Sequence, residues 1–175
     1  MPHVESIHPS KARLHLKWQD APLGALLQIA SPQDDGSTVP TLCMRSVDLT
    51  DDPPSPCVVI VEGPDTGSVF YEEELAERPA LDVREHVHLR INSPRPVRGH
   101  AFHMGGAYAH KDEPEIVWMF AQYAEVSNHL VCLHAPKDKR EWTAIEPFGT
   151  IKDFVLLGHV IAVPGPHHGG ELEMK

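Results

Sequence analysis

The histidines are the residues whose type and spacing could most readily do chemistry. His86 and His88 are separated by one residue in a predicted strand, so both imidazoles project from one face, as two metal ligands can. His100 or His103 could supply a third ligand for Zn, Fe or Mn. The spaced Glu and Gly of a cupin-type metal site do not follow this pair, and the alternative interpretation is a solvated polar strand face.

Covalent catalysis has less support in the residue pattern. The Gly-Xaa-Ser-Xaa-Gly, Cys-Xaa-Xaa-Cys and His-Glu-Xaa-Xaa-His signatures and a phosphate-binding glycine loop are absent. Cys57 and Cys132 lie within apolar strand patterns, where a small buried hydrophobe is favoured over a reactive thiolate. The pair Gly105-Gly106 could let a ligand or another backbone come close, but a tight hairpin end explains it more simply. We therefore assign no catalytic residue.

Short strands must position these side chains. The 17 prolines and 12 glycines divide the chain into short segments and largely exclude long helices. Apolar residues alternate with polar ones in residues 12–18, where Ala12, Leu14, Leu16 and Trp18 are predicted to share one face. The best helix candidate is 72–77. Further strands are predicted at the following residues: 42–49, 57–61, 86–91, 115–120, 130–134 and 154–163.

This spacing predicts a mostly β fold, an antiparallel barrel or folded sheet with few short helices. Residues 1–164 are expected to form a single β-rich domain, followed by a flexible C-terminal tail at 165–175. The chain of 175 residues is long enough for one core.

Charge and cysteine content bound the function classes. The formal net charge of −10 disfavours direct nucleic-acid binding, because phosphate backbones attract cationic surfaces. Three scattered cysteines suit reduced thiols, and no apolar run approaches a membrane span or a signal peptide. We expect a cytoplasmic protein without membrane contact.

The order of segments between residues 56 and 164 carries a family resemblance. Residues 59–63 form an apolar strand that ends in Gly63, 86–91 form a second strand, and 92–100 form a polar turn. The segments 115–117, 128–133 and 154–163 follow in the order of the remaining strands. This part of the chain resembles the carboxy-terminal domain of the LexA/UmuD family of serine–lysine autoproteases and phage repressors. The resemblance implies a β scaffold that serves in dimerisation, partner binding or self-cleavage.

The catalytic positions of that family are not matched. No Ser-Met pair follows Gly63, and Trp118 stands where the resemblance implies the lysine. Ser68 and Lys111 could be a displaced nucleophile and base, but their spacing gives no reason to pair them. The enzyme class therefore stays uncertain, and the chain more closely fits an inactive protease fold.

Protein–protein interaction is the leading hypothesis. Trp118 and Phe120 share a face of their predicted strand, so either both faces of this strand are buried or one docks on a protein partner or on a second copy in a homodimer. The edge strand at 12–18 is another candidate contact. Phage or stress-response regulation is the process that the resemblance implies. The alternative is a metal-dependent, cupin-like β-barrel enzyme that uses the histidines, and residues 149–163 also resemble, faintly, the closing strands of flavin-reductase-type barrels.

Overall fold

The computed structural model of the chain describes residues 12–63, 65–75, 77–92, 102–136, 138, 142–165 and 173–174. The fold is 56% strand and 8% helix, which confirms the expectation of a mostly β protein. Its strands are β1 Arg13–His15, β2 Leu26–Pro32, β3 Thr38–Asp48, β4 Ser55–Ile60, β5 Val69–Tyr71, β6 Ala80–Asp82, β7 Val87–Asn92, β8 Gly106–His110, β9 Glu113–Tyr123, β10 Ser127–His134, β11 Thr143–Ile145, β12 Phe154–Pro164 and β13 Glu173–Met174. The helical turns are η2 Trp18–Asp20, α1 Glu72–Leu75 and η4 Ile151–Asp153.

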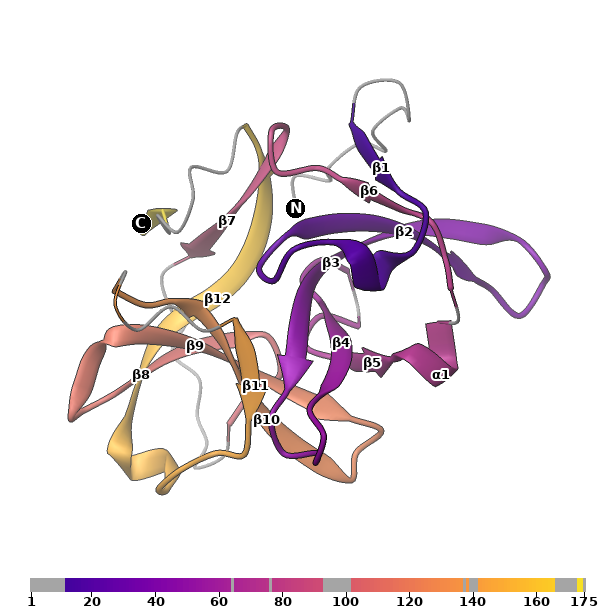
Figure 1. The fold of residues 1–175 in the computed structure, drawn as a ribbon. Coiled ribbons are helices and arrows are strands. Elements are labelled where there is room, and N and C mark those ends of the chain that lie inside the picture. The colour runs from indigo at the N-terminus through magenta and orange to yellow at the C-terminus, as the bar shows by residue number, and fades with distance from the viewer. Residues whose placement is uncertain are drawn as a thin grey trace.

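All of these strands belong to one folded sheet, and its path does not close (Figure 1). The strand order is β1-β6-β2-β3-β11-β10-β9-β8-β12-β7-β13, and β4 and β5 branch from β3. Because β1 and β13 end this path without pairing with each other, the barrel alternative is wrong and the folded-sheet alternative describes the molecule. The sheet is also not wholly antiparallel, since β11 pairs parallel to β3 and β13 parallel to β7.

Local sequence explains several of these elements. The β-branched run in β4 is buried on both faces, as expected for a strand without polar alternation. In β7, Val87, Leu89 and Ile91 are buried and alternate with less buried residues, which confirms the predicted pattern. The acidic helix α1 lies within the predicted 72–77. The chain from Ser55 pairs with β3 even though Pro56 has no N–H to donate to the ladder.

The predicted apolar face of residues 12–18 is wrong. Leu14 and Leu16 are 53% and 75% exposed, whereas His15 between them is buried. Its Nε2 lies 3.6 Å from Asp82 Oδ2 on the neighbouring strand β6, so the buried side of β1 carries a polar contact between the two strands. The strand ends at His15, and Trp18 is fully buried from the turn η2 instead.

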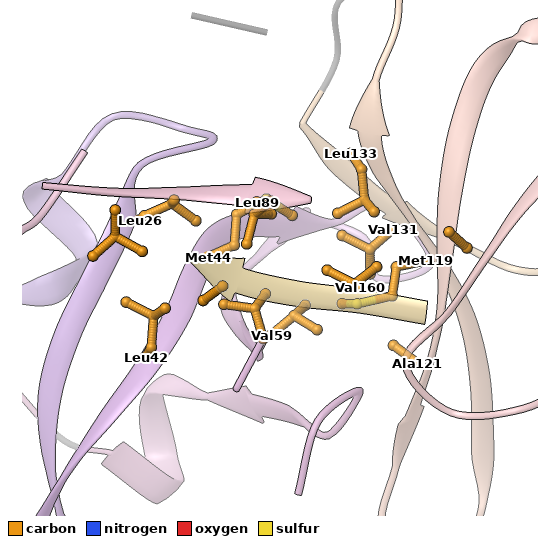
Figure 2. Packing of buried hydrophobic residues seen from close by; sticks show 14 of the residues in the cluster. Leu26, Leu42, Met44, Val59, Leu89, Met119, Ala121, Val131, Leu133 and Val160 are labelled. Carbon is orange, nitrogen blue, oxygen red and sulfur yellow. The ribbon is translucent and has the colours of Figure 1, made fainter. Parts of the chain in front are cut away.

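The main core lies between the folded halves of the sheet. Most of its side chains come from β2, β3, β4, β7, β9, β10 and β12, and Figure 2 shows members of this core gathered around the C-terminal half of β12. The labelled members include Leu26, Met44, Leu89, Met119 and Val160. This packing fixes β12 against its neighbours, because an apolar side chain loses favourable burial if it shifts.

Part of the predicted tail takes part in the sheet. β13 lies within residues 165–175 and pairs with Arg90 and Ile91 of β7. Of this predicted tail, the structure otherwise describes Gly165, and residues 166–172 and 175 lie outside the described residues.

Candidate functional site

A cleft of about 880 Å³ lies where β12, β9 and the segment after β4 approach one another. This volume is within the range of sites that bind small molecules or peptide side chains. One wall is residues 61–63, the opposite wall is residues 159–162, and Ser68, Gly105 and Gln122 lie between them. Asn92, Met104 and the turn at 124–125 also line the cleft.

Two glycines join the elements at this cleft. Gly67 and Gly105 both have positive φ, 94° and 75°, which residues with a Cβ rarely adopt. A Cβ on Gly67 would lie 2.8 Å from the Gly105 nitrogen, and a Cβ on Gly105 would lie 2.8 Å from Thr66. The two backbones can therefore meet only because neither residue has a side chain. The sequence analysis favoured a tight hairpin end at Gly105-Gly106 over close backbone approach, and the contact with Gly67 shows close approach.

Ser68 is fixed beside this junction. It forms an isolated parallel bridge with Gln122 of β9, and the Gln122 N–H donates to the Gly67 carbonyl at 2.8 Å. The Ser68 N–H donates to the Asp65 carbonyl at 2.9 Å. The loop after β4 is thereby tied to β9, and the Ser68 residue lines the cleft.

No general base is joined to Ser68 in the described part of the chain. Lys111 is exposed in the turn between β8 and β9, where His110 pairs with Glu113. Ser68 pairs with Gln122 of β9. Gln122 is nine residues beyond Glu113, or roughly 30 Å along the extended strand. His159 lines the same cleft as Ser68, but no hydrogen bond joins the two side chains. The displaced serine–lysine pair is therefore not assembled.

The edge of β12 forms one wall of the cleft. Residues 159–162 all line it, although successive side chains of a strand point to opposite faces. A surface that meets four consecutive residues must run along the backbone edge of the strand. The Val160 N–H donates to Gly105 at 3.0 Å on this side, and the paired register with β8 ends there.

Carboxylates surround the opening. Glu62, Asp65 and Glu125 line the cleft, and none of its described lining residues is lysine or arginine. Asp65 and Glu125 are exposed. The charged side chains among the described lining residues are therefore acidic, and Val61, Met104 and Ile161 contribute apolar surface; we call the exposed pair Asp65 and Glu125 the rim.

The turn between β9 and β10 is strained where it meets the cleft. Ala124 and Glu125 have φ values of 48° and 62°, in the left-handed region that non-glycine residues rarely occupy. Val126 follows them and is 85% exposed. No residue pattern predicts this turn, because the residues usual in such hairpin turns are Asn, Asp and Gly.

The predicted metal ligands do not come together in the described residues. His86 lies in the turn before β7, and His88 pairs with Val163, its Nδ1 3.3 Å from the Gly165 carbonyl oxygen. His103 lies three residues before Gly106, which pairs with His159 of β12. Roughly 13 Å of β12 separates His159 from Val163, the partner of His88. Within the described ranges no three His, Cys, Asp or Glu side chains are grouped to hold a metal ion, and His100 lies outside these ranges.

Trp118 and Phe120 are buried within the chain rather than offered to a partner. Their exposed fractions are 7% and 3%. They pack in a second core with Tyr108, Phe154 and partly buried Phe102, whose ring stacks on Phe120 at a centroid distance of 5.0 Å. The role predicted for them in partner binding is therefore corrected, because the strand β9 is covered on both faces.

A second polar constellation lies inside the molecule. His129 Nε2 lies 2.9 Å from Asp48 Oδ2, and both side chains are 1% exposed. The Tyr71 hydroxyl donates to the same carboxylate, and the Thr50 N–H and hydroxyl donate to Oδ1 at 2.8 and 2.6 Å. We call Asp48, Thr50, Tyr71 and His129 the buried network.

Electrostatics favour the ionised carboxylate in this network. Burial by itself raises the pKa of Asp48, but the hydrogen bonds from Thr50 and Tyr71 and the charge of His129 outweigh it and lower the pKa below its ordinary value. Burial, followed by the contact with Asp48, raises the pKa of Tyr71. The described partners of the Asp48 carboxylate, Thr50, Tyr71 and His129, meet it where it is 1% exposed, which suits a structural role.

The cysteines are buried as expected from their apolar surroundings. Cys43, Cys57 and Cys132 are free thiols with exposed fractions of 2%, 0% and 3%. Burial raises the pKa of Cys43 and of Cys57 to about 12, so neither is a thiolate near neutral pH.

Comparisons with known proteins add no relative. No protein-family model, curated protein or solved structure matches the chain. Among the described residues, no helix has the length and apolar character needed to cross a membrane.

Proposed function

We propose that this chain is a non-catalytic β domain that acts by binding another protein, and that the cleft is its binding site. The observation that carries the proposal is the combination, in one concave site, of a strand edge that no described residue pairs beyond Val160 with exposed carboxylates. In the described part of the chain no base is hydrogen-bonded to the Ser68 hydroxyl, which supports a non-catalytic role. The net charge of −10 argues for a protein partner over a nucleic acid.

We also propose that the scaffold is of the LexA/UmuD type. In support, the apolar strand β4 is followed by residues 61–63, which line the cleft, and Gly63 ends the strand on which the resemblance rests. The closing strand β12 forms the opposite wall. The residue after Val117 is the buried Trp118, so the position that the resemblance gives to a lysine is part of the aromatic core.

Photo-crosslinking in the native cells tests the binding function. A photoreactive benzoylphenylalanine replaces Met104, which lines the cleft and is 40% exposed, or Val155, which lies on β12 outside the cleft and is 50% exposed. Protein adducts from position 104 and none from position 155 are the expected result. An absence of adducts from both positions contradicts the proposal, and an adduct with a second copy identifies a homodimer.

Incubation at alkaline pH tests the absence of catalysis. An autoprotease with a lysine base cleaves itself faster when the amine is deprotonated. We expect the chain to stay intact for days. Discrete fragments that disappear in Ser68→Ala would overturn the non-catalytic part of the proposal.

A further inference from the structure

We infer that the cleft binds an extended, basic peptide segment, which adds as a strand to the edge of β12. This inference rests on the proposed function and names the chemistry of the partner. Strand addition supplies affinity through backbone hydrogen bonds and specificity through alternate side chains.

The direction of the backbone groups in β12 carries the first step. The Gly165 N–H donates to the His86 carbonyl at 2.8 Å, so odd-numbered residues in this part of β12 face β7. The Val160 N–H donates to Gly105 on the other side, and Ala162, two residues later, faces that side as well. No described residue pairs with the Ala162 N–H and carbonyl there, because the register with β8 includes no residue of β12 beyond His159.

Pro164 fits the same geometry. At this even-numbered position an N–H would face the unpaired side, and proline has none. Prolines within sheets occur where the missing N–H faces away from a ladder, as at an edge. The available backbone groups at this edge are thus the carbonyls of Val160, Ala162 and Pro164 and one donor, the Ala162 N–H.

The edge opens into space that a peptide can fill. Ala162 is 3% exposed, so its unpaired N–H lies inside the cleft rather than on a convex surface. A buried N–H without a partner costs about 1–3 kcal/mol, which a peptide carbonyl would recover. Apolar contacts from Val61, Met104 and Ile161 would hold alternate side chains of the added strand.

Charge selects the partner. Asp65 and Glu125 are exposed carboxylates at the rim, and no lysine or arginine is among the described lining residues. A second copy of this chain, with a net charge of −10, would be repelled by the same rim. Lysine or arginine side chains on the bound segment would instead meet opposite charges, which speed association and fix the register.

The test measures binding of designed peptides to the whole chain by fluorescence anisotropy. The basic octapeptide acetyl-(Lys-Val)4-amide is compared with acetyl-(Glu-Val)4-amide. We expect binding of the basic peptide only, weakened about tenfold in the double variant Asp65→Asn, Glu125→Gln, since each rim contact contributes up to about 1 kcal/mol. Equal binding of the two peptides, or none, overturns the inference.

N-methylation of the peptide tests strand addition without changing the protein. Alternate N–H groups of an added strand face β12, so methylation of either the lysine or the valine nitrogens removes the ladder donors. One methylated series should lose about tenfold or more in affinity, and the other should bind within about threefold of the parent. Equal effects of both series contradict strand addition.

A matched pair of variants locates the contact. Ala162→Pro removes the edge N–H, whereas Ala162→Gly keeps it, and neither breaks the ladder with β7. Only Ala162→Pro should abolish binding of the basic peptide, and circular dichroism reports whether both variants fold. If the basic peptide does not bind but position 104 forms crosslinked protein adducts, this inference alone is overturned. If neither position 104 nor position 155 forms adducts, the proposed function itself is contradicted.

Discussion

The buried network and the cleft both gather polar side chains from distant parts of the chain, yet they differ in what satisfies them. Asp48 is closed off at 1% exposure and receives hydrogen bonds from Thr50, Tyr71 and His129. In the cleft, Asp65 and Glu125 are exposed, and no residue of the described ranges pairs with the backbone of Ala162 on the side that faces the site. The comparison teaches that a conspicuous Asp–His pair can be structural, whereas open groups with unmet partners indicate binding.

The largest expected effect is the loss of the Asp48 charge. Asp48→Asn should lower the free energy of unfolding by roughly 2–3 kcal/mol at pH 7, because an amide cannot accept all the hydrogen bonds that Thr50, Tyr71 and His129 direct at this buried carboxylate. Urea denaturation measures the difference. Peptide binding by the folded variant should be unchanged, and a specific loss of affinity would break the proposed separation of the two regions.

The pH dependence of this loss sharpens the same comparison. Burial raises the pKa of Asp48, but its hydrogen bonds and the interaction with His129 outweigh burial and lower the pKa below 3.8. The ionised carboxylate therefore stabilises the fold above that pH, and this stabilisation is lost as the pH falls through the folded-state pKa. The stability difference between the parent and Asp48→Asn should therefore be constant near neutrality and shrink below about pH 4. Denaturation curves from pH 7 to 3 test this expectation, with Asp34→Asn in an exposed loop as the control. A difference that grows on acidification would contradict the assignment.

Neutralising the rim should affect binding and leave stability nearly unchanged. The free energy of unfolding of the variant Asp65→Asn, Glu125→Gln is expected to lie within about 0.5 kcal/mol of that of the parent, since both side chains are exposed. Its affinity for acetyl-(Lys-Val)4-amide should depend less on salt than that of the parent. Titrations at low and high ionic strength measure how steeply the affinity falls with salt concentration. The same salt dependence in the variant and the parent would show that other residues recognise the charge of the peptide.

The smallest expected effect concerns the strained turn. Ala124→Gly should raise the free energy of unfolding by about 1 kcal/mol, because glycine adopts the φ of 48° without the penalty that alanine bears. Ala30→Gly in β2 is the control and should lower stability by about 0.5–1 kcal/mol. Thermal unfolding of both variants gives the signs. Destabilisation by Ala124→Gly would show that the turn is not strained.

The sequence patterns predicted where strands occur better than they predicted which face of each strand is buried. The apolar run of β4 and the alternation in β7 could be read directly, since each depends on local hydrophobicity. The inward face of β1 could not, because its buried side carries a contact between His15 and Asp82 of β6, which lies far away in the sequence. Trp118 and Phe120 were equally ambiguous until Phe102 and Phe154 were seen to cover them.

The cleft itself had only partial signals in the sequence. Ser68 and Gly105 were singled out, but His159, Gln122 and the Ala162 edge were not. Their proximity depends on Gly67 meeting Gly105 and on β12 changing neighbours along its length, which no local pattern encodes.

By itself, the sequence determined a mostly β chain with short elements, buried thiols and an acidic surface, because these properties follow from composition and from periods of a few residues. Only the tertiary structure decided that the sheet stays open, that Asp48 and His129 are buried together and that one edge of β12 faces a cleft. Those features join residues far apart in the chain, and the free energy of such contacts depends on packing partners that a linear pattern does not specify.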